Sequence, residues 1–171
     1  MSASDGLVVG RGMPALVLRG VLLVVGLAIL TVPLSEGITT GTFVVLLPAV
    51  LASVYAPASP APAGVVIVAA ILAVLAGDNP LRPEVLLLIP LVHLFHVTCG
   101  IAGAIPAAGR VHLRALRAPG LRFLLIQAVM AVLVVVVALL PTGRNAPLLE
   151  ALALVGLAVV ALVTVWLQRV K

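Results

Sequence analysis

The chain carries very little charge for its length. Only 9% of its 171 residues are charged and 64% are hydrophobic, whereas a soluble domain is typically about 25% charged. The mean hydropathy is +1.39. A chain this short has too much surface per unit volume to hide so many apolar side chains from water. The scarcity of charge therefore excludes an ordinary water-soluble fold and predicts a protein embedded in lipid.

Aromatic residues and cysteine are scarce as well. One Trp, one Tyr and three Phe cannot supply the aromatic and basic surface that binds bases, so the net charge of +5 does not indicate a nucleic-acid partner. Cys99 is the single cysteine, which excludes a disulfide framework within the chain. No Asp or Glu lies deep in an apolar segment, which argues against proton or sodium coupling through an intramembrane carboxylate.

Motifs that carry catalysis are also missing. The sequence has no phosphate loop, nucleophile elbow, zinc-protease helix or pair of catalytic carboxylates. We therefore expect a protein that is not an enzyme, with no catalytic residues and no cofactor.

The chain has, instead, six apolar segments separated by short polar turns. Each is expected to be a helix, because a segment in lipid must satisfy its own backbone hydrogen bonds. The predicted fold class is all-α, with residues 1–171 forming one transmembrane domain of a multi-pass protein. The six helices are expected at about 13–34, 38–56, 60–77, 85–105, 121–140 and 148–167.

The charges fall on two sides of this arrangement. Only two of the ten basic residues, Arg82 and Arg144, lie on one side, and the acidic residues Glu36, Asp78 and Glu84 lie there too. Because loop Lys and Arg are retained in the cytoplasm during insertion, the pattern predicts that both termini are cytoplasmic. The other eight basic residues are Arg11, Arg19, Arg110, Arg114, Arg117, Arg122, Arg169 and Lys171.

Residues 37–77 contain no charged side chain, so the charge distribution does not predict how this stretch crosses the membrane. The two segments in this stretch could both cross the membrane, or they could dip in and return on the same side. The segment at 60–77 is short for a span, which takes roughly 20 residues. Two full spans are favoured, because a re-entrant backbone survives only where protein or water covers it.

The fourth segment contains the sharpest local pattern. His93, His96 and Cys99 recur every three residues, so they lie along one helical stripe that drifts by about 60° per step. Three interpretations remain open. The histidines could bond to neighbouring helices and specify packing, or they could line a pore, proton path or substrate site. They could also bind a metal ion or haem with Cys99 as a further ligand, although no second cluster completes the shell.

A basic loop follows this segment. Arg110, Arg114 and Arg117 are spaced i, i+4 and i+7 with apolar residues between them, which predicts a short amphipathic helix on the inner membrane surface. Together with Arg122 they are expected to contact anionic lipid headgroups. The same four residues could instead dock a membrane or cytoplasmic protein with an acidic face.

A few further polar residues lie within the apolar segments. They are expected to form hydrogen bonds to other helices or to the local backbone. These residues are Thr31, Ser53, Gln127 and Thr164.

The amino-acid composition is typical of bacterial proteins. Nine of the ten basic residues are Arg, and Ala, Val, Gly and Pro are abundant, as in GC-rich coding sequences. In this the chain resembles small actinobacterial multi-pass integral membrane proteins of unknown function, some of which are encoded beside MoxR-type ATPases. The resemblance is one of composition and transfers no functional residue. With the apolar segments, it leads us to expect a multi-pass protein of a bacterial plasma membrane.

Three functions are compatible with these features. The leading expectation is a non-enzymatic accessory or partner-binding subunit of a membrane assembly. An alternative is a small transporter or channel with His93 and His96 near the path. A third is a metal- or haem-binding membrane protein.

Overall fold

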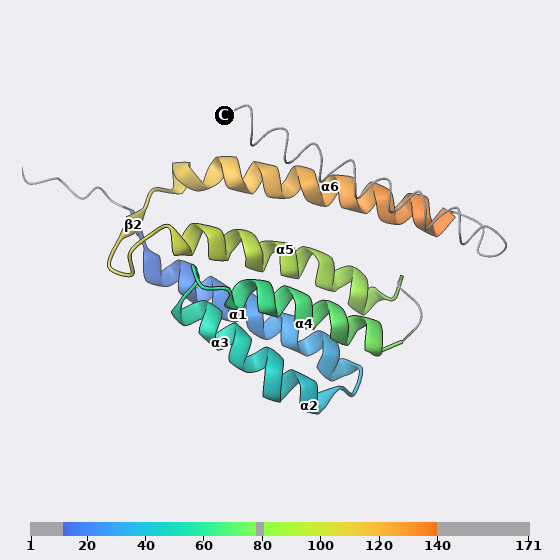
Figure 1. Cartoon of the computed structure of the whole chain (residues 1–171). Helices are drawn as coiled ribbons and strands as arrows, with labels where there is room; N and C mark the ends of the chain where they lie inside the picture. Colours follow the sequence, from blue (N-terminus) through green and yellow to red (C-terminus); the bar gives the residue numbers. More distant parts are fainter. Residues whose placement is uncertain (1–11, 78–80, 140–171) are drawn as a thin grey trace, which may run out of the picture. The chain divides into compact units, whose positions relative to one another are not determined.

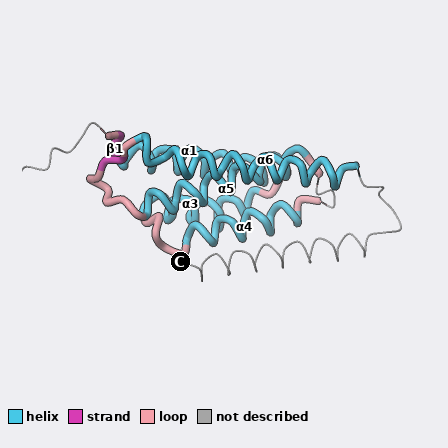
Figure 2. The backbone as a smooth tube through the Cα atoms, turned by 90° about the horizontal axis from the view of Figure 1, so that it is seen from above, coloured by secondary structure: helices cyan, strands magenta, loops and turns pink. Residues whose placement is uncertain are grey.

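The structure is a computed structural model that describes residues 12–77 and 81–139. Contacts divide the chain into two compact units, Met1–Val134 and Val135–Lys171. All described residues up to Val134 belong to the first unit. Figure 2 shows helix along most of the described chain, together with one short pair of strands.

The helical elements match the expected apolar segments closely. The second expected helix, at 38–56, is divided into three consecutive pieces, and the sixth, at 148–167, lies outside the described residues. The all-α class is therefore confirmed for the described part of the chain. The helical elements are α1 (Ala15–Ser35), α2 (Thr39–Gly41), the π-turn η1 (Thr42–Leu46), α3 (Leu47–Tyr55), α4 (Ala61–Leu75), α5 (Pro83–Gly103), the 3₁₀ turn η2 (Leu113–Leu116) and α6 (Arg117–Leu139). The α-helices are labelled in Figure 1.

Three helical segments are long and apolar enough to cross a membrane. They are Ala15–Ser35, Pro83–Gly103 and Leu113–Leu139. The helical stretches Thr39–Tyr55 and Ala61–Leu75 are apolar but shorter. The described chain thus has the composition of a membrane protein.

Helix α1 ends at a turn that the local sequence dictates. Gly37 has φ +78°, a left-handed conformation that glycine adopts without steric cost. Its N–H donates to the Leu34 carbonyl at 3.0 Å, and the Ile38 N–H donates to the Pro33 carbonyl at 2.9 Å. This pair of hydrogen bonds is the Schellman arrangement that closes helices at a glycine. It reverses the chain at the expected turn and starts the next helix.

That next helix widens before a proline. Pro48 has no N–H to give to the carbonyl four residues earlier. The residues before it form the π-turn η1, and the Leu47 N–H donates to the Thr42 carbonyl, five residues back. Thr42 is fully buried, and its hydroxyl donates to the Ile38 carbonyl. A π-turn of this kind is a local response to a disrupted helical ladder.

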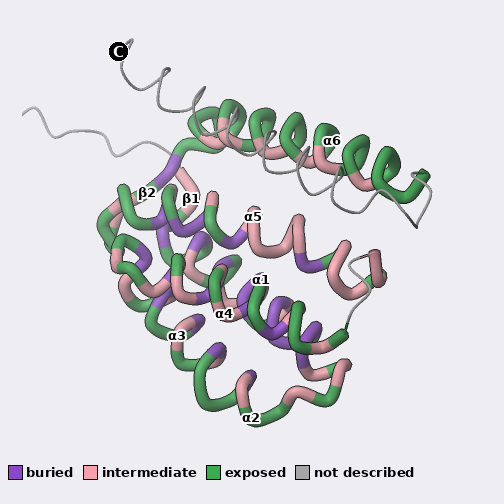
Figure 3. Tube along the Cα trace, turned by 45° about the vertical axis from the view of Figure 1, so that its right-hand side comes forward, coloured by how far each residue is buried: buried purple, intermediate pink, exposed green. Residues whose placement is uncertain are grey.

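Helix α1 is the centre of the packing. It contacts α3, α4 and α5, while α4 packs against both α3 and α5. In Figure 3 the buried residues are concentrated on α1 and on the sides of its neighbours. The fully buried apolar side chains are Leu22 and Ile29 of α1, Leu46 of η1, Val50 of α3, Val65 of α4 and Phe95 of α5.

Gly26 permits the closest approach in this core. A Cβ atom at this position would overlap Val50 Cγ1 and lie 3.3 Å from Phe95 Cε2. Helices α3 and α5 therefore both press against α1 at a residue without a side chain. Small residues at such crossings let helix backbones approach closely, which strengthens packing in lipid.

A pair of two-residue strands ties α1 to the segment after α5. Strand β1 (Met13–Pro14) pairs antiparallel with β2 (Arg110–Val111). The Ala15 N–H, in the first turn of α1, donates to the Gly109 carbonyl at 3.0 Å. The start of α1 and the chain beyond α5 therefore lie at the same end of the bundle. We call this the basic end, because Arg19, Arg110, Arg114, Arg117 and Arg122 belong to it or to the segments that leave it.

The turn between α3 and α4 reaches the same end. Arg19 donates from Nη1 to the Tyr55 carbonyl at 3.3 Å. A Cβ atom on Gly103, the last residue of α5, would lie 3.2 Å from the Ala58 nitrogen. The hairpin formed by α3 and α4 thus extends to the level at which α5 ends.

The basic loop differs from its predicted form. The expected amphipathic helix over Arg110 to Arg117 is wrong, because Arg110 pairs with Pro14 in the strand pair and His112 is extended. The short turn η2 then leads directly into α6. Pro119 and Gly120 lie in the first turn of α6, where the missing N–H of a proline breaks no helical bond. No residue of α6 is buried.

Candidate functional site

His93 bonds to α6, as the packing interpretation predicts. The Gln127 Nε2 amide donates to His93 Nδ1 at 2.8 Å. The His93 and Phe123 rings also lie 5.0 Å apart, tilted by 36°. With the amide in this orientation Nδ1 is an acceptor, which leaves the proton of a neutral imidazole on Nε2. His93 therefore links α5 to the otherwise unburied α6.

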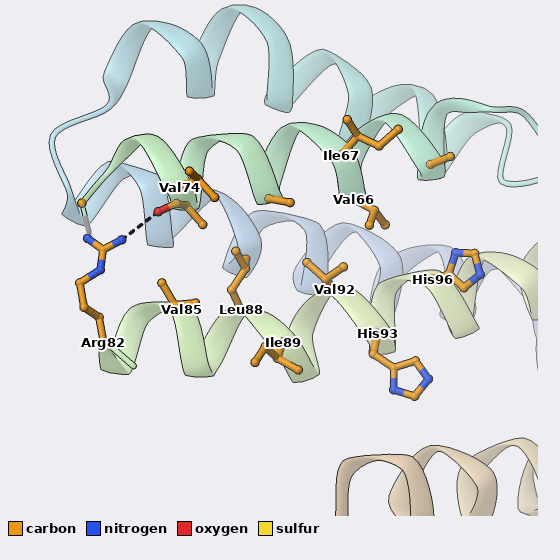
Figure 4. Close-up of a pocket in the computed structure, with 14 residues that line it drawn as sticks. Val66, Ile67, Val74, Arg82, Val85, Leu88, Ile89, Val92, His93 and His96 are labelled. Atoms are coloured by element: carbon orange, nitrogen blue, oxygen red, sulfur yellow. Dashed lines mark hydrogen bonds between the residues drawn. The ribbon is translucent and has the colours of Figure 1, made fainter. Parts of the chain in front are cut away.

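His96 points in a different direction. It is exposed, and no hydrogen-bond partner for it lies within residues 12–77 and 81–139. In Figure 4, His96 projects on the side of α4, whereas His93 projects on the opposite side of α5. The drift of the helical stripe has separated the two imidazoles, although both line one groove between α4 and α5.

This groove is open and has a volume of about 960 Å³. Its walls are aliphatic along most of their length, and its polar side chains lie only at the two ends, with Arg82 at one and the two histidines at the other. A groove of this volume and lining is typical of sites that hold apolar small molecules. The aliphatic wall consists of Ala63, Val66, Ile67, Ala70, Ala73 and Val74 from α4 and of Val85, Leu88, Ile89 and Val92 from α5.

Cys99 is separated from the groove. Its side chain is 2% exposed and belongs to the core among α1, α3, α4 and α5. The metal-site interpretation needs His93, His96 and Cys99 to converge, and the structure does not bring them together. Among the described residues, no group of three His, Cys, Asp or Glu side chains is placed to hold a metal ion.

Arg82 organises the end of the bundle opposite to the strands. Its Nη1 lies 3.0 Å from Glu36 Oε1, just past the end of α1. The same guanidinium donates to the Ala76 carbonyl at 3.0 Å and to the Ala73 carbonyl at 2.8 Å, at the end of α4. A cation at a helix C-terminus satisfies carbonyls that lack helical partners and favourably meets the helix dipole. We call this the paired end.

The four arginines that we expected to contact lipid or a partner are all exposed. Arg110 lies in β2, Arg114 in η2, and Arg117 and Arg122 in the first turns of α6. The two acidic residues in the described chain, Glu36 and Glu84, lie at the opposite, paired end. The basic end is therefore an unneutralised cationic surface within the part of the chain that the structure describes.

The polar residues within the apolar helices bond as expected. Thr31 donates to the Ala28 carbonyl and Ser53 to the Ala49 carbonyl, each at 2.7 Å. Gln127 bonds to His93. Local backbone or interhelical bonding is thus confirmed for these three residues, and Thr164 lies outside the described residues.

The comparisons with known proteins leave the site to be interpreted from its geometry. No known protein family, curated protein or solved structure matches this chain.

Sequence reasoning missed the groove and the pairing of Arg82 with Glu36. The charges of the pair were visible, and both residues were placed on the same side, but nothing in their spacing predicts contact. The groove had a partial signal, since Ala63, Ala70 and Ala73 of α4, which line it, are small residues. Small residues alone do not show whether a helix packs closely or leaves an opening.

Proposed function

We propose that this protein is a non-enzymatic, multi-pass protein of a bacterial plasma membrane that serves as a partner-binding subunit of a membrane assembly. The observation that supports the proposal is the exposed cationic surface of the basic end. Its exposed arginines belong to β2, η2 and α6, and the strand pair holds β2 beside the start of α1. Such a surface attracts anionic headgroups and could also hold an acidic face of a partner.

The proposed topology has six spans with both termini in the cytoplasm. The separation of the basic end from the paired end supports it, because Lys and Arg are concentrated on the cytoplasmic side of membrane proteins. The position of the turn between α3 and α4 beside Gly103 supports two full spans for this hairpin. A re-entrant hairpin would have its turn at the middle of α5.

Helix α6 offers a second surface for a partner. It is an apolar helix of 23 residues without a buried residue, joined to α5 by the bond between His93 and Gln127. Lipid can cover such a helix, and so can a helix of another subunit. A partner helix would gain packing and hydrogen bonds that lipid chains do not provide.

Purification from native membranes in mild detergent tests this function. We expect a second protein to co-purify, and we expect the triple variant Arg114→Gln, Arg117→Gln, Arg122→Gln to lose it while its melting temperature stays unchanged. Glu84→Gln, a change of charge at the paired end, is the matched control and should keep the partner. A solitary wild-type protein, or a partner that the triple variant retains, would contradict the proposal.

A small transporter is the second candidate function. The observation in its favour is that His93, at the middle of α5, and His96, about one turn further along, both line the same groove. If they lie on a transport path, the double variant His93→Ala, His96→Ala should abolish flux in vesicles while the protein remains folded. Unchanged flux would remove both histidines from any transport mechanism.

A further inference from the structure

The groove between α4 and α5 has the polarity of a site for a neutral lipid. Its one charged lining residue is Arg82. That guanidinium already faces the Glu36 carboxylate and the carbonyls of Ala73 and Ala76. An anionic ligand would have to compete with these groups for the cation. The remaining lining residues are aliphatic apart from the histidines and Gly77, so electrical complementarity favours an uncharged occupant.

His96 supplies the hydrogen-bonding group at the other end. It lies seven residues before the end of α5, which places it about 10 Å inside the helix terminus at a rise of 1.5 Å per residue. Polar side chains at such a depth are expensive to leave unpaired and mark functional sites. A neutral imidazole donates through one ring nitrogen and accepts through the other. A carbonyl or a hydroxyl on the ligand therefore suits it.

The length of the groove matches that of an extended lipid tail. From Arg82 to His96 it follows fourteen residues of α5, or about 21 Å at 1.5 Å per residue. Half of the hydrocarbon core is only about 15 Å thick. A phospholipid of the bilayer keeps its head at the surface and its tails within one leaflet. A ligand with its head at His96 needs a head small and neutral enough to enter the hydrocarbon.

We propose that this groove binds an uncharged, single-tailed lipid, with the tail along the aliphatic walls and a small carbonyl or hydroxyl head bonded to His96. Isoprenoid quinones and isoprenoid alcohols share this chemistry. The site is distinct from the proposed partner-binding surfaces, because neither α6 nor the arginines of the basic end contribute a lining residue. The groove is open at the surface of the bundle, so a lipid can enter it from the bilayer.

Direct binding measurements on the intact protein in nanodiscs test the site. The probes are decylubiquinone, geranylgeraniol and geranylgeranyl phosphate. We expect at least one of the two neutral probes to bind more tightly than the phosphate. Binding of the quinone alone assigns a carbonyl head, binding of the alcohol alone assigns a hydroxyl head, and binding of both supports the shared chemistry. A phosphate that binds as tightly as the better neutral probe overturns the proposal.

Two variants test the contact with the lipid head and the space for the lipid tail separately. His96→Leu should weaken binding of the neutral probe by about fivefold to tenfold, the effect of losing one hydrogen bond. Ala70→Phe places a ring inside the groove and should abolish binding. The matched controls are His112→Leu, in the exposed loop, and Ala52→Phe, on the exposed side of α3, and both should bind as wild type.

The same variants overturn the proposal if they behave otherwise. Wild-type affinity in Ala70→Phe shows that the probe lies elsewhere, and wild-type affinity in His96→Leu removes the head contact. If no neutral probe binds and Ala70→Phe instead breaks a dimer of the wild-type protein, the groove is a contact between two copies. Melting temperatures of all variants establish that each result comes from folded protein.

Discussion

At the scale of single residues, Gly26 is the position on which the packing of three helices depends. A Cβ atom there would overlap a methyl group of Val50, and it would also press on Phe95. Both neighbours are fully buried, so neither can move out into the solvent or lipid without disturbing the core. Well-packed interiors lose stability when a group is added as well as when one is removed.

Gly26→Ala should therefore lower the free energy of unfolding by about 1–3 kcal/mol, the usual effect of overpacking. Thermal or denaturant unfolding in detergent measures it. Gly20→Ala is the matched control on the same helix, because nothing lies within 4 Å of a Cβ at that position. The control should be neutral or slightly stabilising, since alanine favours a helix over glycine by up to about 1 kcal/mol. Equal effects of the two substitutions would contradict the close approach at Gly26.

The bond between Gln127 and His93 makes a second prediction at this scale. Such bonds in membrane proteins contribute about 0.6 kcal/mol on average and up to about 2 kcal/mol. A double-mutant cycle with Gln127→Leu and His93→Leu should give a coupling energy in that range. The same cycle with Gln127→Leu and His96→Leu is the control and should give a coupling near zero, because His96 projects away from α6. Coupling of similar size in both cycles would contradict this separation.

The histidines show how far the sequence could predict this site. Helical periodicity correctly predicts that His93, His96 and Cys99 follow a drifting stripe. It does not predict which neighbouring helix or cavity each of these three side chains contacts. In the structure His93 bonds to α6, His96 lines the groove, and Cys99 lies in the core. That assignment depends on how four helices pack, which a local pattern in one helix does not contain.

At the scale of the elements, the proposed number of membrane spans depends on the hairpin of α3 and α4. The turn at Ala58 lies beside Gly103, and Arg19 bonds to the Tyr55 carbonyl. The turn is therefore at the basic end, while the Ser35 end of α1 is beside the paired end. A hairpin whose tip lies at the level of the α5 terminus crosses the bundle from one end to the other.

Cysteine labelling in a Cys99→Ala background should reveal this arrangement. Ala58→Cys should react with an impermeant maleimide only from the cytoplasmic side, and Ser35→Cys only from the outside. Both positions are exposed in the structure. Labelling of intact cells and of inverted vesicles provides the two readouts. Reaction of both cysteines from the same side would show a re-entrant hairpin.

The limits of element prediction have identifiable causes. The apolar runs predicted the helices of the described chain, because long apolar segments in lipid have few alternatives to helix. The loop after α5 was predicted poorly, since its spacing of arginines also suits a short helix. The decisive interaction there is the pairing of Arg110 with Pro14, ninety-six residues earlier in the chain. Non-local pairing of two-residue strands leaves no readable pattern in the sequence.

At the scale of the whole molecule, the distribution of charged residues distinguishes the same two ends of the bundle that the helix packing does. Five of the six arginines in the described chain belong to the basic end and its adjoining segments, and the sixth, Arg82, lies at the paired end with Glu36. The described carboxylates lie at the paired end. The same separation that we attribute to membrane insertion would also set where the proposed charged partner binds. Topology and partner binding would share the same residues.

The sharing of these residues leads to a prediction for insertion. Replacing Arg110, Arg114, Arg117 and Arg122 by Gln removes most of the charge bias that orients the described helices. We expect a fraction of the molecules to insert upside down, which labelling of Ser35→Cys from both sides measures. Arg82→Gln is the control and should preserve a single orientation, because the charge it removes opposes the bias. A uniform orientation in the quadruple variant would show that the exposed arginines of the basic end are dispensable for topology, which would leave partner or headgroup binding as their role.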